Sequence, residues 1–129
     1  MNGKTSRRKG HNFEREIANR FKPIYPNAQR LLEYQQGEGK DIQGVPWRIQ
    51  CKCRTNPNVW EALKEAEESV GIGFPVAVVK RTQIKGRPVK TVAVMDFDDW
   101  LELVSSLKTM LENKIKTETD DDEQKGRDG

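Results

Sequence analysis

Residues 40–54, KDIQGVPWRIQCKCR, indicate the fold because polar and apolar side chains alternate along them on both sides of a turn. Gly44 and Pro46 interrupt the alternation, since glycine permits a turn and proline removes a donor from a strand ladder. Successive side chains of a strand point to opposite faces of a sheet. The stretch therefore predicts two strands, over 42–45 and 47–54, that meet as a hairpin.

The second of these strands has two chemically different faces. Its apolar face consists of Trp47, Ile49, Cys51 and Cys53. Its polar face carries an amide among three cations, namely Arg48, Gln50, Lys52 and Arg54. Because the chain has no third cysteine and His11 is its only histidine, a structural zinc site is improbable. We expect both cysteines to be reduced, small apolar residues packed under a helix.

An acidic residue is predicted to face the core from the amino-terminal helix. Apolar residues at helical spacing predict a helix over 12–21, which Pro23 ends. At about 100° of rotation per residue, Glu14 falls inside the apolar stripe that Phe13 and Ile17 define. The helix therefore brings a carboxylate toward the sheet.

The remaining patterns predict a helix, three strands, a helix, two strands and a helix. The further elements are a strand over 28–35, a helix over 59–70 with Trp60 in its core face, strands over 74–80 and 91–95, and a last helix capped by Asp96 or Asp98 that contains Trp100 and ends near Leu111. We expect an α/β fold with a mixed five-stranded sheet flanked by helices, in the order αβββαββα, because strand four needs a crossover helix.

Length and charge predict one domain with two charged ends. A chain of 129 residues suffices for one core. The net charge of +3 conceals a basic start and an acidic end. We predict a basic arm over 1–10, a folded domain over 11–112 and a disordered acidic tail over 113–129. The sequence has no apolar run long enough to span a membrane and no secretory leader, which predicts a cytoplasmic protein.

The polar residues of this arrangement suit metal-dependent phosphate chemistry. Asp41, Gln50 and Glu14 offer oxygen ligands from two strands and a helix, and oxygen ligands suit a hard cation such as Mg²⁺. Lys52 can hold a water aimed at a phosphate. A plain solvated face is the alternative interpretation, and phosphodiester cleavage is the reaction class that this pattern favours.

These pieces, in this order, resemble the restriction-endonuclease-like nucleases written PD-(D/E)XK, and within them the archaeal and phage Holliday junction resolvases. The resemblance covers most of residues 8–105. The family's "RKG...ERE" helix is matched at 8–10 and 14–16, its "DI" at Asp41-Ile42, and its "ExK" at Gln50-Cys51-Lys52. Three separate pieces in order are moderately specific.

The resemblance implies a role for each matched residue. Asp41 binds Mg²⁺, for which Mn²⁺ can substitute, and Gln50 and the carbonyl of Cys51 complete the shell. Lys52 positions the attacking water, and Glu14 binds metal or orients water. The candidate contacts to DNA phosphates are Arg7, Arg8, Lys9, Arg15, Arg30, Lys40 and Arg54; for each of these, a plain surface role is an equal alternative.

Gln50 departs from the family pattern, in which glutamate stands at this position. An amide oxygen can ligate Mg²⁺ but adds no negative charge, so the site should hold metal less firmly. Glu38, just before Asp41, is a candidate source of the missing charge. Three functions remain open for this reason: a junction-resolving endonuclease, another nuclease of this fold that acts on nicks, ends or duplex, and a nucleic-acid-binding protein on an impaired nuclease scaffold.

The first of these functions carries further expectations about partners. A four-way junction has approximate two-fold symmetry and needs two coordinated cuts, so the resemblance implies a homodimer acting on branched DNA during recombination or repair. Either Trp60 or Trp100 could serve the dimer interface, although their positions favour a core role for both. The small size and the resemblance suggest a phage protein in a bacterial host. The sequence contains no recognisable DNA-reading module, which favours recognition of shape through phosphates.

Overall fold

A computed structural model describes most of the chain. The described residues are 3–31, 39–83 and 85–127, with side chains described at 8–31, 39–83 and 85–118. The chain divides into two compact units, residues 1–96 and residues 97–129. The first unit holds all of the predicted site.

The order of elements matches the predicted αβββαββα order. The elements are α1 (Gly3–Phe21), β1 (Gln29–Arg30), β2 (Ile42–Gln43), β3 (Arg48–Arg54), α2 (Val59–Glu68), β4 (Pro75–Arg81), β5 (Lys90–Val94) and α3 (Phe97–Arg127). The prediction of an α/β fold is therefore confirmed.

The prediction of one five-stranded sheet is wrong for the residues that the structure describes. β1 and β2 form a two-stranded antiparallel sheet, and β3, β4 and β5 form a three-stranded sheet in that order. β3 and β4 run parallel across the α2 crossover, whereas β4 and β5 are antiparallel. The expected β2–β3 hairpin ladder is replaced by β2–β1 pairing, and Asp41 N donates to Ile49 O at 2.8 Å beside it.

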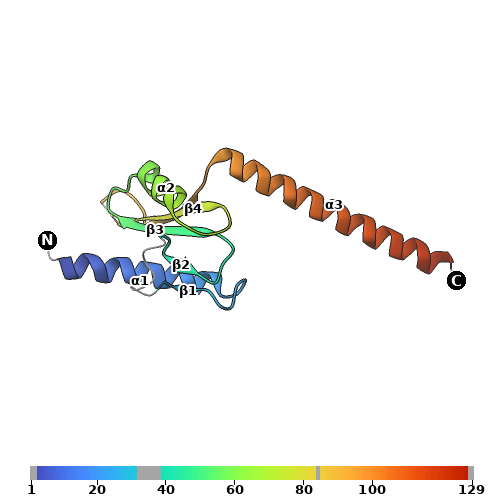
Figure 1. Ribbon diagram of the computed structural model, residues 1–129, viewed down its shortest axis with the longest axis horizontal. Helices are drawn as coiled ribbons and strands as arrows, with labels where there is room; N and C mark the ends of the chain where they lie inside the picture. The colour runs from blue at the N-terminus through green and yellow to red at the C-terminus, as the bar shows by residue number, and fades with distance from the viewer. Residues whose placement is uncertain (1–2, 32–38, 84, 128–129) are drawn as a thin grey trace. The chain divides into compact units, whose positions relative to one another are not determined.

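The two helices of the first unit pack on opposite faces of the three-stranded sheet (Figure 1). The α1 face contains the core residues Phe13, Ile17, Ala18, Ile42, Ile49, Cys53 and Val78. The α2 face contains the smaller cluster of Ala62, Ala77 and Val79. The predicted alternation of β3 is therefore confirmed: Ile49 and Cys53 face α1, and both cysteines are free thiols.

Both ends of α2 are fixed by side-chain hydrogen bonds. Asn58 caps the start, where its Oδ1 accepts from Trp60 N at 3.1 Å and from Glu61 N at 3.2 Å. At the other end, Arg48 donates to Ser69 O at 2.7 Å and to Glu67 O at 3.2 Å. Arg48 therefore leaves the predicted polar site and stabilises the carboxyl end of α2.

The prediction that Trp60 packs in the core is wrong. Its side chain is 80% exposed, and the buried residues of α2 are Ala62, Leu63 and Ala66. Two alanines let the helix approach the sheet closely, and Trp60 lies two residues from Ala62, about 200° around the helix. The buried face of α2 is therefore centred on Ala62, Leu63 and Ala66, and not on the side of the helix that carries Trp60.

The terminal helices are longer than the sequence predicts. α1 begins at Gly3 rather than at residue 12, so the basic segment forms its first turns. α3 continues to Arg127 through the segment predicted to be disordered. Within it, Lys108 and Glu112 pair at 3.7 Å across one turn, and Thr117 Oγ1 donates to Asn113 O at 2.9 Å. The Lys108–Glu112 pair, at positions i and i+4, favours helix over coil.

α3 carries a row of exposed apolar side chains. They are Phe97, Trp100, Leu101, Val104, Leu107, Met110, Leu111 and Ile115, and the rings of Phe97 and Trp100 stack with their centroids 5.8 Å apart. Trp100 is therefore exposed within the unit that contains it, at 46%. Within the described parts of the chain, no helix is long and apolar enough to cross a membrane.

Candidate metal and phosphate site

Asp41 is held rigidly at the edge of β3. Its Oδ2 accepts a hydrogen bond from Cys51 N at 2.7 Å, and its own backbone bonds to Ile49 O and to Leu31 N. Burial raises the pKa of Asp41 to about 6, against the lowering effect of the Cys51 amide and of Lys52, and the charge of Glu65 raises it further. The carboxylate is therefore fixed in place, but the Cys51 amide and Lys52 do not fully offset the cost of burying its negative charge.

Glu14 approaches the same place from α1. Its side chain is only 13% exposed, which confirms that it points inward from the apolar stripe. Burial raises the pKa of Glu14 to about 7, the charge of Asp41 adds to this, and Arg30 opposes it. The Arg30 guanidinium lies 3.8 Å from Glu14 Oε2. A helix and a strand edge thus bring two carboxyl groups into one desolvated region, as the sequence predicts.

Gln50 and Lys52 lie on the other face of β3, against α2. Lys52 Nζ pairs with Glu65 Oε2 at 2.7 Å, and Gln50 Nε2 donates to the same oxygen at 3.3 Å. Because the charges of Lys52 and Glu65 both affect the pKa of Asp41, these residues belong to one electrostatic cluster. β3 therefore links the acids on its edge to a lysine on its α2 face.

Glu65 is the site residue that sequence reasoning missed. The sequence pattern predicts that the glutamates of α2 face solvent, but Glu65 lies only about 60° around the helix from Ala62. Ala62 is fully buried, and Glu65 is half-buried beside it. An acid next to the alanine face of the helix was the available signal.

Two buried oxygens at this site have no hydrogen-bond partner among the described residues, namely Glu14 Oε2 and Gln50 Oε1. A buried acceptor without a donor is costly, and a cation would satisfy it. The N–H and C=O of one strand residue point to the same edge, so the Cys51 carbonyl faces the same side as the amide that bonds Asp41. These donors fit a hard cation.

The donor set is mixed rather than purely acidic. Over the described residues, no three His, Cys, Asp or Glu side chains are grouped so that they could hold a metal by themselves. Any cation here would therefore rely on Asp41, Glu14, the Gln50 amide oxygen and the Cys51 carbonyl together. Glu38, the other predicted source of charge, lies outside the described residues.

A basic hollow lies beside the acidic pair. It has a volume of about 320 Å³ and is lined by Arg15, Ala18, Asn19, Lys22, Gln29 and Arg30. Arg30 connects it to Glu14 through their ion pair. The lining holds three cations and no acid, so the hollow can accept a phosphate near the carboxylates. Two of the predicted phosphate contacts, Arg15 and Arg30, therefore line the same hollow.

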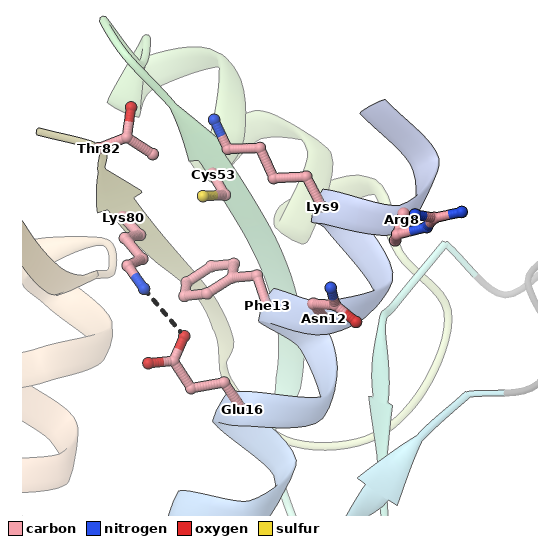
Figure 2. Close-up of a pocket in the computed structure, with 8 residues that line it drawn as sticks. All are labelled: Arg8, Lys9, Asn12, Phe13, Glu16, Cys53, Lys80 and Thr82. Carbon is pink, nitrogen blue, oxygen red and sulfur yellow. Dashed lines mark hydrogen bonds and ion pairs between the residues drawn. The ribbon is translucent and has the colours of Figure 1, made fainter. Parts of the chain in front are cut away.

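Two other predicted DNA contacts, Arg8 and Lys9, line a second hollow. It measures about 550 Å³ between α1 and the ends of β3 and β4, and Figure 2 shows its lining residues, which include Arg8, Lys9, Phe13 and Cys53. Lys80 reaches across it to Glu16 at 3.2 Å. Arg8 and Lys9 are exposed at its rim.

The last three predicted DNA contacts are dispersed. Arg54 is exposed and donates to Cys53 O at 3.3 Å. Lys40 is half-buried next to Asp41. The side chain of Arg7 lies outside the described set. Of the predicted DNA contacts whose side chains are described, Arg15 and Arg30 are the two that line a hollow without an acid, together with Lys22. Arg81, Arg87 and Lys90 line another hollow that also holds no acid.

Comparisons of this chain with protein-family models, curated proteins and solved structures find no match. The nuclease resemblance accordingly stays a prediction from the motifs. What the geometry adds is chemical: at and beside β3 it places the carboxyl groups of Asp41 and Glu14, the buried amide oxygen of Gln50 and the amine of Lys52, and a basic hollow adjoins Glu14 through Arg30. This set can bind a divalent cation and place a phosphodiester beside it.

Proposed function

We propose that this protein is a Mg²⁺-dependent endonuclease that cuts branched DNA, resolving four-way junctions by paired phosphodiester cleavage. The observation that carries the proposal is that two buried oxygens, Gln50 Oε1 and Glu14 Oε2, lack a hydrogen-bond donor, while burial raises the pKa of the Asp41 carboxyl to about 6. Glu14 Oε2 has the Arg30 guanidinium as an ion-pair partner, at 3.8 Å. A purely structural polar cluster would satisfy these atoms with protein donors. A cation-binding site leaves them without a hydrogen-bond donor from the protein.

Each residue has a distinct task in the proposed reaction. Asp41, Glu14, the Gln50 amide oxygen and the Cys51 carbonyl hold the cation, which supplies Lewis-acid polarisation of the scissile phosphate when it is bound. Lys52 orients the attacking water and offsets the negative charge that develops on the phosphate oxygens. Water forms the new bond to phosphorus and gives up a proton to the solvent, while the bond to a sugar oxygen breaks and that oxygen leaves as an alcohol after taking a proton from solvent water.

The basic hollow supports DNA as the substrate. Arg15, Lys22 and Arg30 line it without an opposing acid in its wall, and Arg30 adjoins Glu14. Cations arranged in this way contact phosphates without reading bases. Selectivity for branched DNA and a homodimeric assembly rest on the resemblance, since a junction with two-fold symmetry needs two matched cuts.

Asp41→Asn tests the proposed chemistry most simply. We expect the parent protein to nick DNA in Mg²⁺ or Mn²⁺, to lose this activity in EDTA, and to lose at least about a hundredfold in rate with Asp41→Asn. Asp98→Asn, at an exposed position of α3, is the matched control and should cut like the parent.

A nucleic-acid-binding protein is the second candidate, and Gln50 favours it because an amide replaces a charged ligand. This candidate predicts salt-sensitive DNA binding that Asp41→Asn leaves unchanged, with no cutting in either metal. Cleavage of linear duplex as fast as of junctions would instead indicate another nuclease of this fold.

A further inference from the structure

Gln50 and Glu65 share a hydrogen bond that fixes which way the amide faces. Gln50 Nε2 donates to Glu65 Oε2 at 3.3 Å, and the opposite end of the amide, Oε1, is buried without a partner. A carboxylate is an acceptor only, so it can bind the nitrogen end of the amide but not the oxygen end. Glu65 therefore selects the orientation in which Gln50 presents its oxygen.

The same Glu65 oxygen also holds Lys52. Its Oε2 lies 2.7 Å from Lys52 Nζ and accepts from the Gln50 amide. Gln50 and Lys52 are two residues apart and share one face of β3. One carboxylate from α2 thus orients both polar side chains that β3 contributes to the proposed site.

We propose that Glu65 is a positioning residue which, together with Gln50, replaces the single strand glutamate of the family pattern: Gln50 supplies the oxygen ligand and Glu65 supplies the negative charge behind it. Residues that bond to a metal ligand from outside orient that ligand and increase its ability to donate. The inference rests on the proposed function, because it assigns a second residue to the same cation site.

The proposal predicts that the importance of Glu65 depends on the residue at position 50. In the parent protein, Glu65→Gln removes the charge and lets the amide turn, so the affinity for Mn²⁺ should fall about tenfold or more. With Gln50→Glu already present, the strand carries its own charged ligand, and Glu65→Gln should change Mn²⁺ affinity less than about twofold.

A double-mutant cycle on the full chain measures this dependence directly. Mn²⁺ binding is titrated for the parent protein, Gln50→Glu, Glu65→Gln and the double variant, using the electron paramagnetic resonance signal of free Mn²⁺. Glu68→Gln is the matched control, since Glu68 is on the same helix and pairs only loosely with Lys64 at 4.0 Å. Circular dichroism confirms that each variant is folded.

The outcomes separate the two proposals. A loss of affinity with Glu65→Gln that disappears in the Gln50→Glu background supports the positioning role. An equal loss in both backgrounds, or none in the parent, overturns it while leaving the metal site intact. If the parent binds no Mn²⁺ and cuts no DNA, the proposed function itself fails, and the inference fails with it.

Discussion

Glu65 Oε2 lies 2.7 Å from Lys52 Nζ and so joins α2 to the polar face of β3. The side chains of Lys52 and Glu65 are 21% and 34% exposed. A partly exposed ion pair contributes only about 1 kcal/mol or less to folding. The main role of this ion pair is therefore to hold the Lys52 amine in position, and its contribution to folding stability is small.

Replacing Lys52 should separate cutting from metal binding. We expect Lys52→Gln to lower the cleavage rate at least about a hundredfold, because the lysine orients water and offsets transition-state charge. Mn²⁺ affinity should be unchanged or tighter, since a positive charge near the cation is removed. Parallel rate and Mn²⁺ titration measurements check this, with Lys64→Gln on the exposed side of α2 as control. Loss of metal binding with Lys52→Gln would contradict the assigned role.

The raised pKa values of Glu14 and Asp41 predict how stability depends on pH without metal. Their folded-state pKa values are about 7 and about 6, against ordinary values of 4.5 and 3.8. The folded protein therefore binds more protons than the unfolded chain between these values. The contribution of these two carboxyl groups to the free energy of unfolding in EDTA should be largest at about pH 4 and below, and should decrease as the pH rises to about 7.

Chemical denaturation from pH 4 to pH 8 measures this trend. The double variant Glu14→Gln and Asp41→Asn should flatten the curve over this window, because it removes both titrating groups. Mg²⁺ should raise the stability of the parent at pH 7.5 by binding the ionised carboxylates. An equal dependence of stability on pH for the parent and the double variant in EDTA would contradict the raised pKa values of Glu14 and Asp41.

Gly44 should be among the least replaceable residues of the fold. It has a φ of +81°, and a Cβ there would collide with the backbone carbonyl of Asn27. We expect Gly44→Ala to destabilise the protein by about 2 kcal/mol or more. Gly86 has a φ of +84° but open space around it, so Gly86→Ala should cost only about 1 kcal/mol. Urea denaturation of both variants measures the loss of stability from collision plus backbone strain at Gly44 and from backbone strain alone at Gly86. Equal losses of stability would contradict the close approach of Gly44 to Asn27.

The basic hollow predicts a measurable salt effect. Arg15→Gln should weaken binding to DNA of any sequence and reduce the slope of log affinity against log salt by about 1, as expected for one lost phosphate contact. Lys85→Gln, at an exposed turn position outside the hollow, is the control. Fluorescence anisotropy at several salt concentrations gives both slopes. An unchanged slope for Arg15→Gln would place the DNA elsewhere.

Much of the site could be predicted because strand alternation is a local rule. The two-residue period of β3 placed Cys53 in the core and Lys52 on the opposite face, and the helical period turned Glu14 inward. These inferences need only neighbouring residues. Local periodicity is therefore sufficient to predict from the sequence that Glu14 faces the sheet near Asp41.

The parts that failed depend on contacts distant in sequence. Glu65 joins the site because α2 packs against the sheet, with Ala62 on Ala77 and Val79 of β4 and Glu65 on Lys52 of β3. Arg48 leaves the site because it donates to the carbonyls of Glu67 and Ser69. The division into two sheets likewise follows from the pairing of β2 with β1. The pattern of apolar residues within one helix or strand does not show which residues of another element will contact it.

Cleavage of a labelled four-way DNA junction beside a matched linear duplex is the most direct test of the central claim. The account predicts paired, symmetric nicks on the junction in Mg²⁺, little cutting of the duplex, and loss of the nicks in EDTA and with Asp41→Asn. Tight junction binding with no cutting in Mg²⁺ or Mn²⁺ would contradict the account and would identify the cluster around Asp41 as part of a DNA-binding protein.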